Sequence, residues 1–275
     1  MGRLLSEAQI EQYKRDGFSG PVQVMSAQEA MALRAHLEAY EAESGGPISG
    51  NFRFNSHLLF PWLADLVRLP RLLDGVEDVL GPDLLCWSTT WFIKEAHTPS
   101  FVGWHQDNTY AYLDDADNLT AWVALGDTSK ENGGMQVLPG THGRQLPHED
   151  TFGADNLLTR GQQVQSGFDA SRAVSLEPKA GEMTMHHSLL LHTSAGNPSA
   201  ERRIGFTIRY LPARQCSRTA IRNYATLVRG TDHWNHFEPA PTPTASLQPD
   251  MLALHAEANA RHAAIILQGA DKTAF

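Results

Sequence analysis

Cysteine, basic residues and long apolar runs are scarce in this chain of 275 residues. With only Cys86 and Cys216, no disulfide framework is expected, and a chain of this length does not need one in a reducing cytoplasm. The 22 basic residues against 31 acidic ones give a formal charge of −9, which argues against a nucleic-acid or anionic-membrane partner. No run of about 18 apolar residues predicts a membrane span, and no secretion signal is expected. These absences favour a soluble, cytoplasmic enzyme. They do not show whether the protein is a monomer or an oligomer.

The length and the order of the structural signals favour one domain over residues 1–275, in three parts. Residues 1–82 are expected to form a mainly helical buttress, and residues 83–212 a β-rich core. Residues 213–275 are expected to form an extension that contains a helix. Helices first and strands later predict an α+β fold, in which the N-terminal helices buttress a two-sheet barrel.

Helix signals concentrate in the first part of the chain. Ser6 and Ser26 each precede a glutamine or glutamate by three positions, which is the capping-box pattern of a helix start. The second of these helices is expected to continue until a Gly-Gly-Pro sequence stops it. Pro70 divides a further helical stretch over 61–80. A last, alanine-rich helix is predicted over Leu252–Leu267.

From Leu84 onwards, β-branched and aromatic residues predict strands. Leu146–Arg172 interrupts them with a polar, glycine-punctuated stretch, and a loop of more than about 15 residues in a compact domain is often a functional lid. The segments expected to be strands are Leu84–Lys94, Trp104–Asp107, Thr120–Gly126, Met135–Leu138, Val174–Leu176, Glu182–Leu190 and Ile204–Leu211.

The most informative pattern is His105 and Asp107, two positions apart, followed far downstream by His192 and Arg203. In a strand, residues i and i+2 point the same way, so His105 and Asp107 can both face one ion. Two imidazoles and one carboxylate on one face of a metal leave the other face open, as in the facial triad of non-haem Fe(II) oxygenases. Ser194 shares the strand face of His192, and Arg203 offers a planar fork suited to a dicarboxylate co-substrate.

Alternation in Arg203–Tyr210 supports this interpretation. One set of alternate positions is apolar and is expected to be core, whereas the other set carries Arg203 and Arg209. An inward arginine is costly to bury without an anionic partner. Arg203 is therefore expected to bind a carboxylate, and Arg209 to contact substrate, to pair with an acidic residue, or to lie near the barrel mouth.

The order of these residues resembles the phytanoyl-CoA dioxygenase family, whose members are mostly Fe(II)- and 2-oxoglutarate-dependent oxygenases. The resemblance extends from about residue 4 to about residue 210 and shows no departure at the metal positions. Three further segments carry it, Thr120–Leu125, Glu131–His142 and Arg203–Tyr210.

The resemblance implies a double-stranded β-helix, a jelly-roll or cupin-like barrel. It implies that His105, Asp107 and His192 bind Fe(II), and that Arg203 and Ser194 bind the distal carboxylate of 2-oxoglutarate. Such enzymes use O₂, release succinate and CO₂, and most often hydroxylate an unactivated C–H bond. Halogenating relatives have alanine or glycine in place of the aspartate, so Asp107 disfavours halogenation.

Several residues near the motif remain open in role. Lys94 is expected either to contact the co-substrate or substrate, or to lie as a solvated strand end. Trp104 and Tyr110 are candidates to line the substrate pocket, with Arg209 beside them. The basic residues and the polar loop favour a small polar or anionic organic substrate.

Other histidines compete with the metal assignment. His148-Glu149-Asp150 is a rival His-x-Asp pair, but it lies in the expected loop, without a strand to hold both side chains on one face. His186 shares strand parity with His192 and could support the site, although a kink at Ser188 would transfer that role to His187. His142 is expected to cap a turn.

Alternative functions follow from the same residues. The same cofactors could desaturate or cyclise a natural-product intermediate. A His₂-carboxylate site could instead hold Zn²⁺ for hydrolysis, which would leave Arg203 and Ser194 without a task. A non-catalytic cupin-like binding protein is the third alternative.

Overall fold

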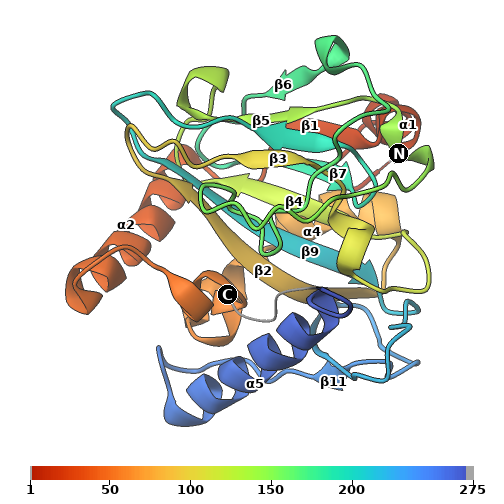
Figure 1. Cartoon of the computed structure of the whole chain (residues 1–275). Coiled ribbons are helices and arrows are strands. Elements are labelled where there is room, and N and C mark those ends of the chain that lie inside the picture. Colours follow the sequence, from red (N-terminus) through yellow and green to blue (C-terminus); the bar gives the residue numbers. More distant parts are fainter. Residues whose placement is uncertain (1, 271–275) are drawn as a thin grey trace.

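Two β-sheets dominate the computed structural model, which describes residues 2–270 (Figure 1). Within these residues, all neighbouring strands are antiparallel except the last pair of the larger sheet. The larger sheet has the spatial order β1 (Phe18–Gln23), β7 (Glu182–His187), β4 (Leu119–Ala124), β9 (Arg203–Pro212), β2 (Leu84–Lys94), β10 (Tyr224–Arg229) and β11 (Glu238–Pro239). The smaller sheet has the order β3 (Val102–His105), β8 (His192–Ser194), β5 (Met135–Val137) and β6 (Val174–Leu176).

The predicted helices are present. Ser6 and Ser26 form complete capping boxes, and Pro70 begins a separate helix as predicted. In Figure 1 the C-terminal helix lies beside the β10–β11 end of the larger sheet. None of the helices in residues 2–270 is long and apolar enough to cross a membrane. The helices are α1 (Glu7–Asp16), α2 (Ala27–Ser44), α3 (Pro61–Leu66), α4 (Pro70–Leu80) and α5 (Pro249–Ile266).

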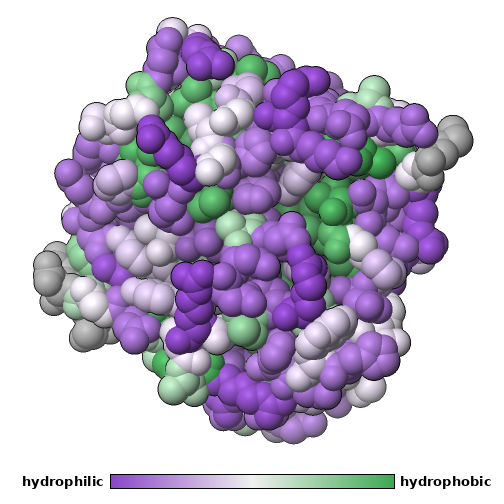
Figure 2. Space-filling model, turned by 90° about the vertical axis from the view of Figure 1, so that its right-hand side faces the viewer, coloured by the Kyte–Doolittle hydropathy of each residue, from purple (hydrophilic) through white to green (hydrophobic). Residues whose placement is uncertain are grey.

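Strand β9 divides the interior into an apolar side and a polar side. Its alternate residues Ile204, Phe206, Ile208 and Tyr210 are fully buried in the main hydrophobic core, as predicted. The opposite face of β9 lines the cavity that holds the candidate site. On that face Gly205 has no side chain, and a Cβ there would overlap the indole of Trp122 on neighbouring β4. The outer surface is mainly hydrophilic, with smaller hydrophobic areas, on the face in Figure 2.

Four strands were missing from the sequence interpretation. β1 was overlooked because Gly20 and Pro21 interrupt its pattern, and its pairing with β7 shifts register there. β8 has only three residues, β11 has two, and β10 was taken as part of a loop-rich extension. The first third is therefore not purely helical. β7 ends at His187, earlier than predicted, because a turn separates it from β8.

Candidate metal and co-substrate site

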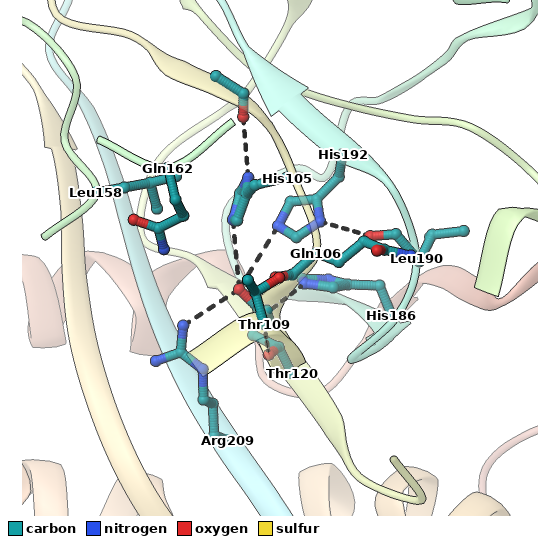
Figure 3. A network of polar contacts seen from close by, with 12 residues as sticks. His105, Gln106, Thr109, Thr120, Leu158, Gln162, His186, Leu190, His192 and Arg209 are labelled. Atoms are coloured by element: carbon teal, nitrogen blue, oxygen red, sulfur yellow. Dashed lines mark hydrogen bonds and ion pairs between the residues drawn. The ribbon is translucent and has the colours of Figure 1, made fainter. Parts of the chain in front are cut away.

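Strand pairing brings His105 and His192 together. They are opposite residues of β3 and β8, and their ring centroids are 4.0 Å apart. Asp107 begins the short 3₁₀ helix η3 (Asp107–Tyr110), and its Oδ1 lies 3.4 Å from His105 Nε2 and 3.9 Å from His192 Nε2. One possible ligand atom from each of the three residues lies within 4.8 Å of the others. Figure 3 shows the rings of His105 and His192 side by side, with dashed lines that run from both to one place.

The expectation that one strand carries both His105 and Asp107 is wrong in detail. β3 ends at His105, and η3 begins at Asp107. Gln106 between them is still extended, with φ −120° and ψ 130°, and its side chain donates to the carbonyls of Arg144 and Leu189. The alternation expected of a strand therefore continues from His105 to Asp107, although the paired strand itself ends before Asp107.

Backbone carbonyls select the tautomer of both histidines. His105 Nδ1 donates to the Gly103 carbonyl and His192 Nδ1 to the Leu190 carbonyl, each at 2.9 Å. A neutral ring that donates from Nδ1 leaves the lone pair of Nε2 free for a metal. Burial, with the neighbouring imidazoles His105 and His186, holds the pKa of His192 well below its usual 6.5. These rings therefore fit metal ligation.

Asp107 is held as a carboxylate. Burial would raise its pKa, but the Arg209 guanidinium and the surrounding histidines outweigh burial and hold the pKa well below the usual 3.8. Arg209 Nη2 lies 3.2 Å from Oδ1, and Thr120 donates its hydroxyl to Oδ2 at 2.6 Å. Of the three alternatives for Arg209, the ion pair is present, and its partner is Asp107. Two neutral imidazoles and one ionised carboxylate are a fitting donor set for Fe(II).

Two buried cations lie on one side of this cluster. Lys94 and Arg203 are paired residues of β2 and β9, and they are 0% and 2% exposed. Lys94 Nζ donates to Ser194 Oγ at 2.8 Å and also to the Ala195 carbonyl. Arg203 Nη1 donates to the Gly133 carbonyl at 3.0 Å, while its Nε has no partner in residues 2–270. The alternative of a solvated Lys94 is therefore wrong.

The electrostatics of this pair call for an anion. Neither cation forms an ion pair with a carboxylate among the described residues. Burial, and secondly the charge of Arg203, lower the pKa of Lys94 to about 6, and burial lowers that of Arg203 to about 10. Buried charges without a counter-charge are costly. A carboxylate placed between Lys94 and Arg203 would remove that cost, which fits the far end of 2-oxoglutarate.

Two adjoining cavities meet at Asp107. The first, of about 410 Å³, lies between the histidines and Arg203. The second, of about 620 Å³, shares Phe92, Asp107 and Arg209 with the first. Its other lining residues come from several distant segments, namely Phe54, Trp87, Thr90, Tyr110, Ala111, Leu157, Leu158, Thr159, Gln162, His262 and Ile266. We call the first the co-substrate cavity and the second the substrate cavity, after the roles that we propose for them below.

Comparison with known proteins places the chain. The family model described as phytanoyl-CoA dioxygenase (PhyH) matches residues 13–205. The chain belongs to this family. A "Probable alpha-ketoglutarate-dependent hypophosphite dioxygenase" of Stutzerimonas stutzeri is 31% identical over 163 residues, which cover 58% of this chain and 56% of that protein. The "L-proline trans-4-hydroxylase" of Streptomyces griseoviridis is 25% identical over 229 residues, which cover 72% and 83%.

A solved structure agrees with this assignment. The structure described as "non-heme monooxygenase; ThoJ apo" is 33% identical, with a TM-score of 0.84 over 94% of this chain and 98% of that one. The predicted family and fold are confirmed: the two sheets are those of a jelly-roll oxygenase, although no strand pairing within residues 2–270 closes them into a barrel. This PhyH-family chain is an Fe- and 2-oxoglutarate-dependent oxygenase.

Trp104 and Tyr110, the two aromatic residues expected to line the substrate pocket, have different positions in this PhyH-family site. Trp104 lines neither cavity, because it alternates with His105 along β3 and packs instead against Phe168, at 5.3 Å between ring centroids. Tyr110 does line the substrate cavity. Its hydroxyl donates to Asp150 at 2.7 Å, and the Arg160 guanidinium lies 3.6 Å from its ring centroid.

The competing histidines have other partners. His148 Nε2 accepts the Gln106 backbone N–H at 2.9 Å, and Asp150 pairs with Arg160, so they are not a metal pair. His187 points away from the site, towards His142. The distance from His142 Nε2 to the carbonyl oxygen of Lys14, in the last turn of α1, is 3.1 Å.

Sequence reasoning missed the substrate side of the site. Trp87 was one residue of a predicted strand, Phe54 was not considered, and His262 was one residue of a predicted helix. His262 is nevertheless well positioned: Asn223 accepts the Tyr224 N–H through Oδ1, so its Nδ2 faces His262 Nδ1 at 3.3 Å. An amide nitrogen can only donate, so the neutral ring carries its proton on Nε2. No motif in the sequence signals this convergence.

Proposed function

We propose that the chain is a hydroxylase that oxidises an unactivated C–H bond of a small polar or anionic organic molecule. One observation carries the proposal: a buried pair of cations flanks the His-Asp-His cluster on one side, and a separate cavity adjoins it on the other. A dicarboxylate and a substrate can therefore reach one metal from two directions. This arrangement allows 2-oxoglutarate and the substrate each to be held beside the metal in a cavity of its own.

Each residue has a defined task in this proposal. His105, Asp107 and His192 hold Fe(II), and Arg203 binds the far carboxylate of 2-oxoglutarate with Lys94 and Ser194. When bound, iron and 2-oxoglutarate supply with O₂ the oxidising chemistry that hydroxylates carbon and yields succinate and CO₂. The protein holds the reacting C–H bond near the metal and keeps water away from it.

The lining of the substrate cavity supports a polar or anionic substrate. Arg209 and His262 supply positive charge and an N–H donor, and Gln162 can donate as well. Asp107 is the one carboxylate among the lining residues, and it is already engaged by Arg209 and the metal cluster. Aromatic walls such as Trp87 complement the apolar part of the molecule. Tyr110 and Arg209 are the predicted residues that we retain as substrate contacts.

The segment Leu146–Arg172 is proposed to be a lid. Its residues 157–159 and Gln162 form part of the substrate-cavity wall. Arg160 helps to fasten it, since the guanidinium donates to the Ile266 carbonyl at 3.0 Å at the end of α5. Asp150 of the same segment pairs with Arg160 and accepts the Tyr110 hydroxyl. Opening would require the bonds to Ile266 and Tyr110 to break, whereas the Arg160–Asp150 pair could move with the lid.

Desaturation or cyclisation by the same cofactors uses the same geometry and is the second candidate. Hydrolysis with Zn²⁺ and a non-catalytic binding role leave the Lys94 and Arg203 pair without an anion to bind, so we do not favour them. A cytoplasmic location, a single domain over residues 1–275 and the absence of nucleic-acid or membrane partners stay predictions. The two cysteines are free, which is compatible with a reducing compartment.

An anaerobic titration tests the proposal. Fe(II) and then 2-oxoglutarate are added to the metal-free protein, and the visible charge-transfer band of the chelate is recorded. We expect the band in the wild type, and Arg203→Ala should need about 100-fold more 2-oxoglutarate because it removes one partner of a buried charge pair. Arg202→Ala is the control, since Arg202 pairs with Glu41 and Glu95 away from the site. Bound iron without a band would contradict the proposal.

A further inference from the structure

His186 is a third imidazole at the cluster, and no task has yet been given to it. It lies on β7, 1% exposed, with its ring centroid 4.4 Å from that of His192. Its Nε2 lies 3.4 Å from Oδ2 of Asp107 (Figure 3). Neither ring nitrogen has a hydrogen-bond partner in residues 2–270. A buried polar ring without partners is unfavourable, so folding alone does not favour a histidine at this position.

The sheet fixes this ring in place. His186 is opposite Thr120 of β4 on one side and Phe18 of β1 on the other, so its backbone is in the interior of the larger sheet. The adjacent His187 shows the contrast. It points to the other face, lies with its ring centroid 5.2 Å from that of His142 in a tilted arrangement, and accepts the Leu189 N–H through Nδ1 at 3.0 Å.

The two oxygens of Asp107 have different neighbours. Oδ1 faces the possible ligand atoms of His105 and His192 and accepts from Arg209 Nη2 at 3.2 Å. Oδ2 faces the Thr120 hydroxyl and His186. The group of mutually close ligand atoms comprises His105, Asp107 and His192, without His186. His186 is therefore placed to act on the carboxylate and not as a ligand.

We propose that His186 is a positioning residue which, together with Thr120, holds Oδ2 of Asp107 so that Oδ1 alone is presented to the metal. The inference rests on the proposed function, because it concerns the same metal. A carboxylate bound through one oxygen occupies one coordination position, and a carboxylate bound through both occupies two. Restraint of Oδ2 thus keeps a position open for 2-oxoglutarate or O₂.

Three variants separate this role from packing. His186→Phe keeps the ring and removes its nitrogens, whereas His186→Gln replaces Nε2 by an amide N–H of similar reach. His187→Asn is the matched control, because it changes the adjacent residue on the opposite face and keeps an acceptor for Leu189. For each protein we would measure Fe(II) affinity anaerobically, the Co(II) absorption spectrum, the 2-oxoglutarate band, and the thermal midpoint without metal.

We expect His186→Phe to weaken Fe(II) binding about 10-fold, in the range for loss of a group that orients a metal ligand. Its metal-free thermal midpoint should stay close to that of the wild type, since the volume of the ring is kept and Asp107 retains Arg209 and Thr120 as partners. His186→Gln should recover most of the affinity, and His187→Asn should bind metal like the wild type.

Other results overturn the inference. Unchanged metal affinity and an unchanged Co(II) spectrum in His186→Phe would remove the role. A lower metal-free thermal midpoint that accounts for the weaker binding would make His186 structural. Loss of one coordinated nitrogen from the Co(II) spectrum of His186→Phe, relative to the wild type, would show that His186 is itself a metal ligand. Failure of the wild type itself to form the 2-oxoglutarate band would overturn the proposed function as well, whereas a wild-type band with any of the first three results overturns only this inference.

Discussion

The two cavities on either side of Asp107 are built from different parts of the molecule. Apart from Asp107, strands supply the co-substrate cavity: β2, β3, β4, β5, β7, β8 and β9 all contribute side chains. The substrate cavity takes only a minority of its wall from strands, and the rest comes from Phe54, η3 with the adjoining Ala111, the segment containing Leu157, and the end of α5. Strand register fixes side chains in pairs, as with Lys94 and Arg203.

We interpret this difference as a division of tasks, in which the strand-built cavity serves the chemistry and the other cavity serves the selection of substrate. Side chains on paired strands are held rigidly, which suits a metal and a co-substrate whose shapes do not vary. Connecting segments and terminal helices tolerate change, which suits recognition of different substrates on one scaffold. His262 lies beyond residues 13–205, the part that matches the family model. The portion of the chain that we propose to recognise substrate is therefore partly outside the portion that matches the family model.

The largest expected effect is at the boundary of the two cavities. Asp107→Ala removes the one carboxylate of the cluster and leaves Arg209 without its partner. We expect 2-oxoglutarate turnover to fall to background and Fe(II) affinity to fall by more than about 100-fold, beyond the loss seen when only a supporting group is removed. Succinate release and anaerobic iron titration measure this. His148→Ala is the control, and loss of iron in that variant instead would reassign the metal to the rival pair.

An intermediate effect concerns the co-substrate cavity alone. The pKa of Lys94 is lowered to about 6 by burial and by Arg203, so without co-substrate the amine is mostly neutral above pH 6. A bound carboxylate favours the protonated amine, so binding takes up a proton and wild-type affinity for 2-oxoglutarate should fall as pH rises above 6. Lys94→Met should bind about 10-fold more weakly near pH 6, for loss of one charged hydrogen bond, and the gap should narrow by pH 8.

The anaerobic charge-transfer titration, repeated at several pH values, checks this. A comparison within each pH cancels the titration of the histidine ligands, which both proteins share. A constant ratio between wild type and Lys94→Met across the range would show that Lys94 is not coupled to the co-substrate.

The same division explains what the sequence could predict. The metal triad and Arg203 were accessible because short motifs carry them, and the apolar face of β9 was accessible from alternation. The end of β3 before Asp107 was not accessible, because the extended backbone of Gln106 keeps the alternation of a strand without its pairing. The substrate cavity was inaccessible because its walls come from positions as distant as Phe54 and His262, which only tertiary packing brings together.

The smallest expected effect on co-substrate binding comes from a change in the substrate cavity. His262→Leu removes an N–H donor that Asn223 orients and that burial, with Arg209, keeps neutral by lowering the pKa of the ring to about 3. The Fe(II) and 2-oxoglutarate band should be unchanged, because His262 does not line the co-substrate cavity. Stimulation of 2-oxoglutarate turnover by amino acids and small carboxylic acids is the readout. The best wild-type stimulant should bind about 10-fold more weakly to the variant, for one lost hydrogen bond. The opposite result would be a weakened Fe(II) and 2-oxoglutarate band in His262→Leu with an unchanged set of stimulating molecules. It would show that the two cavities are not separate, because a change at α5 would then affect the metal site and not the choice of substrate.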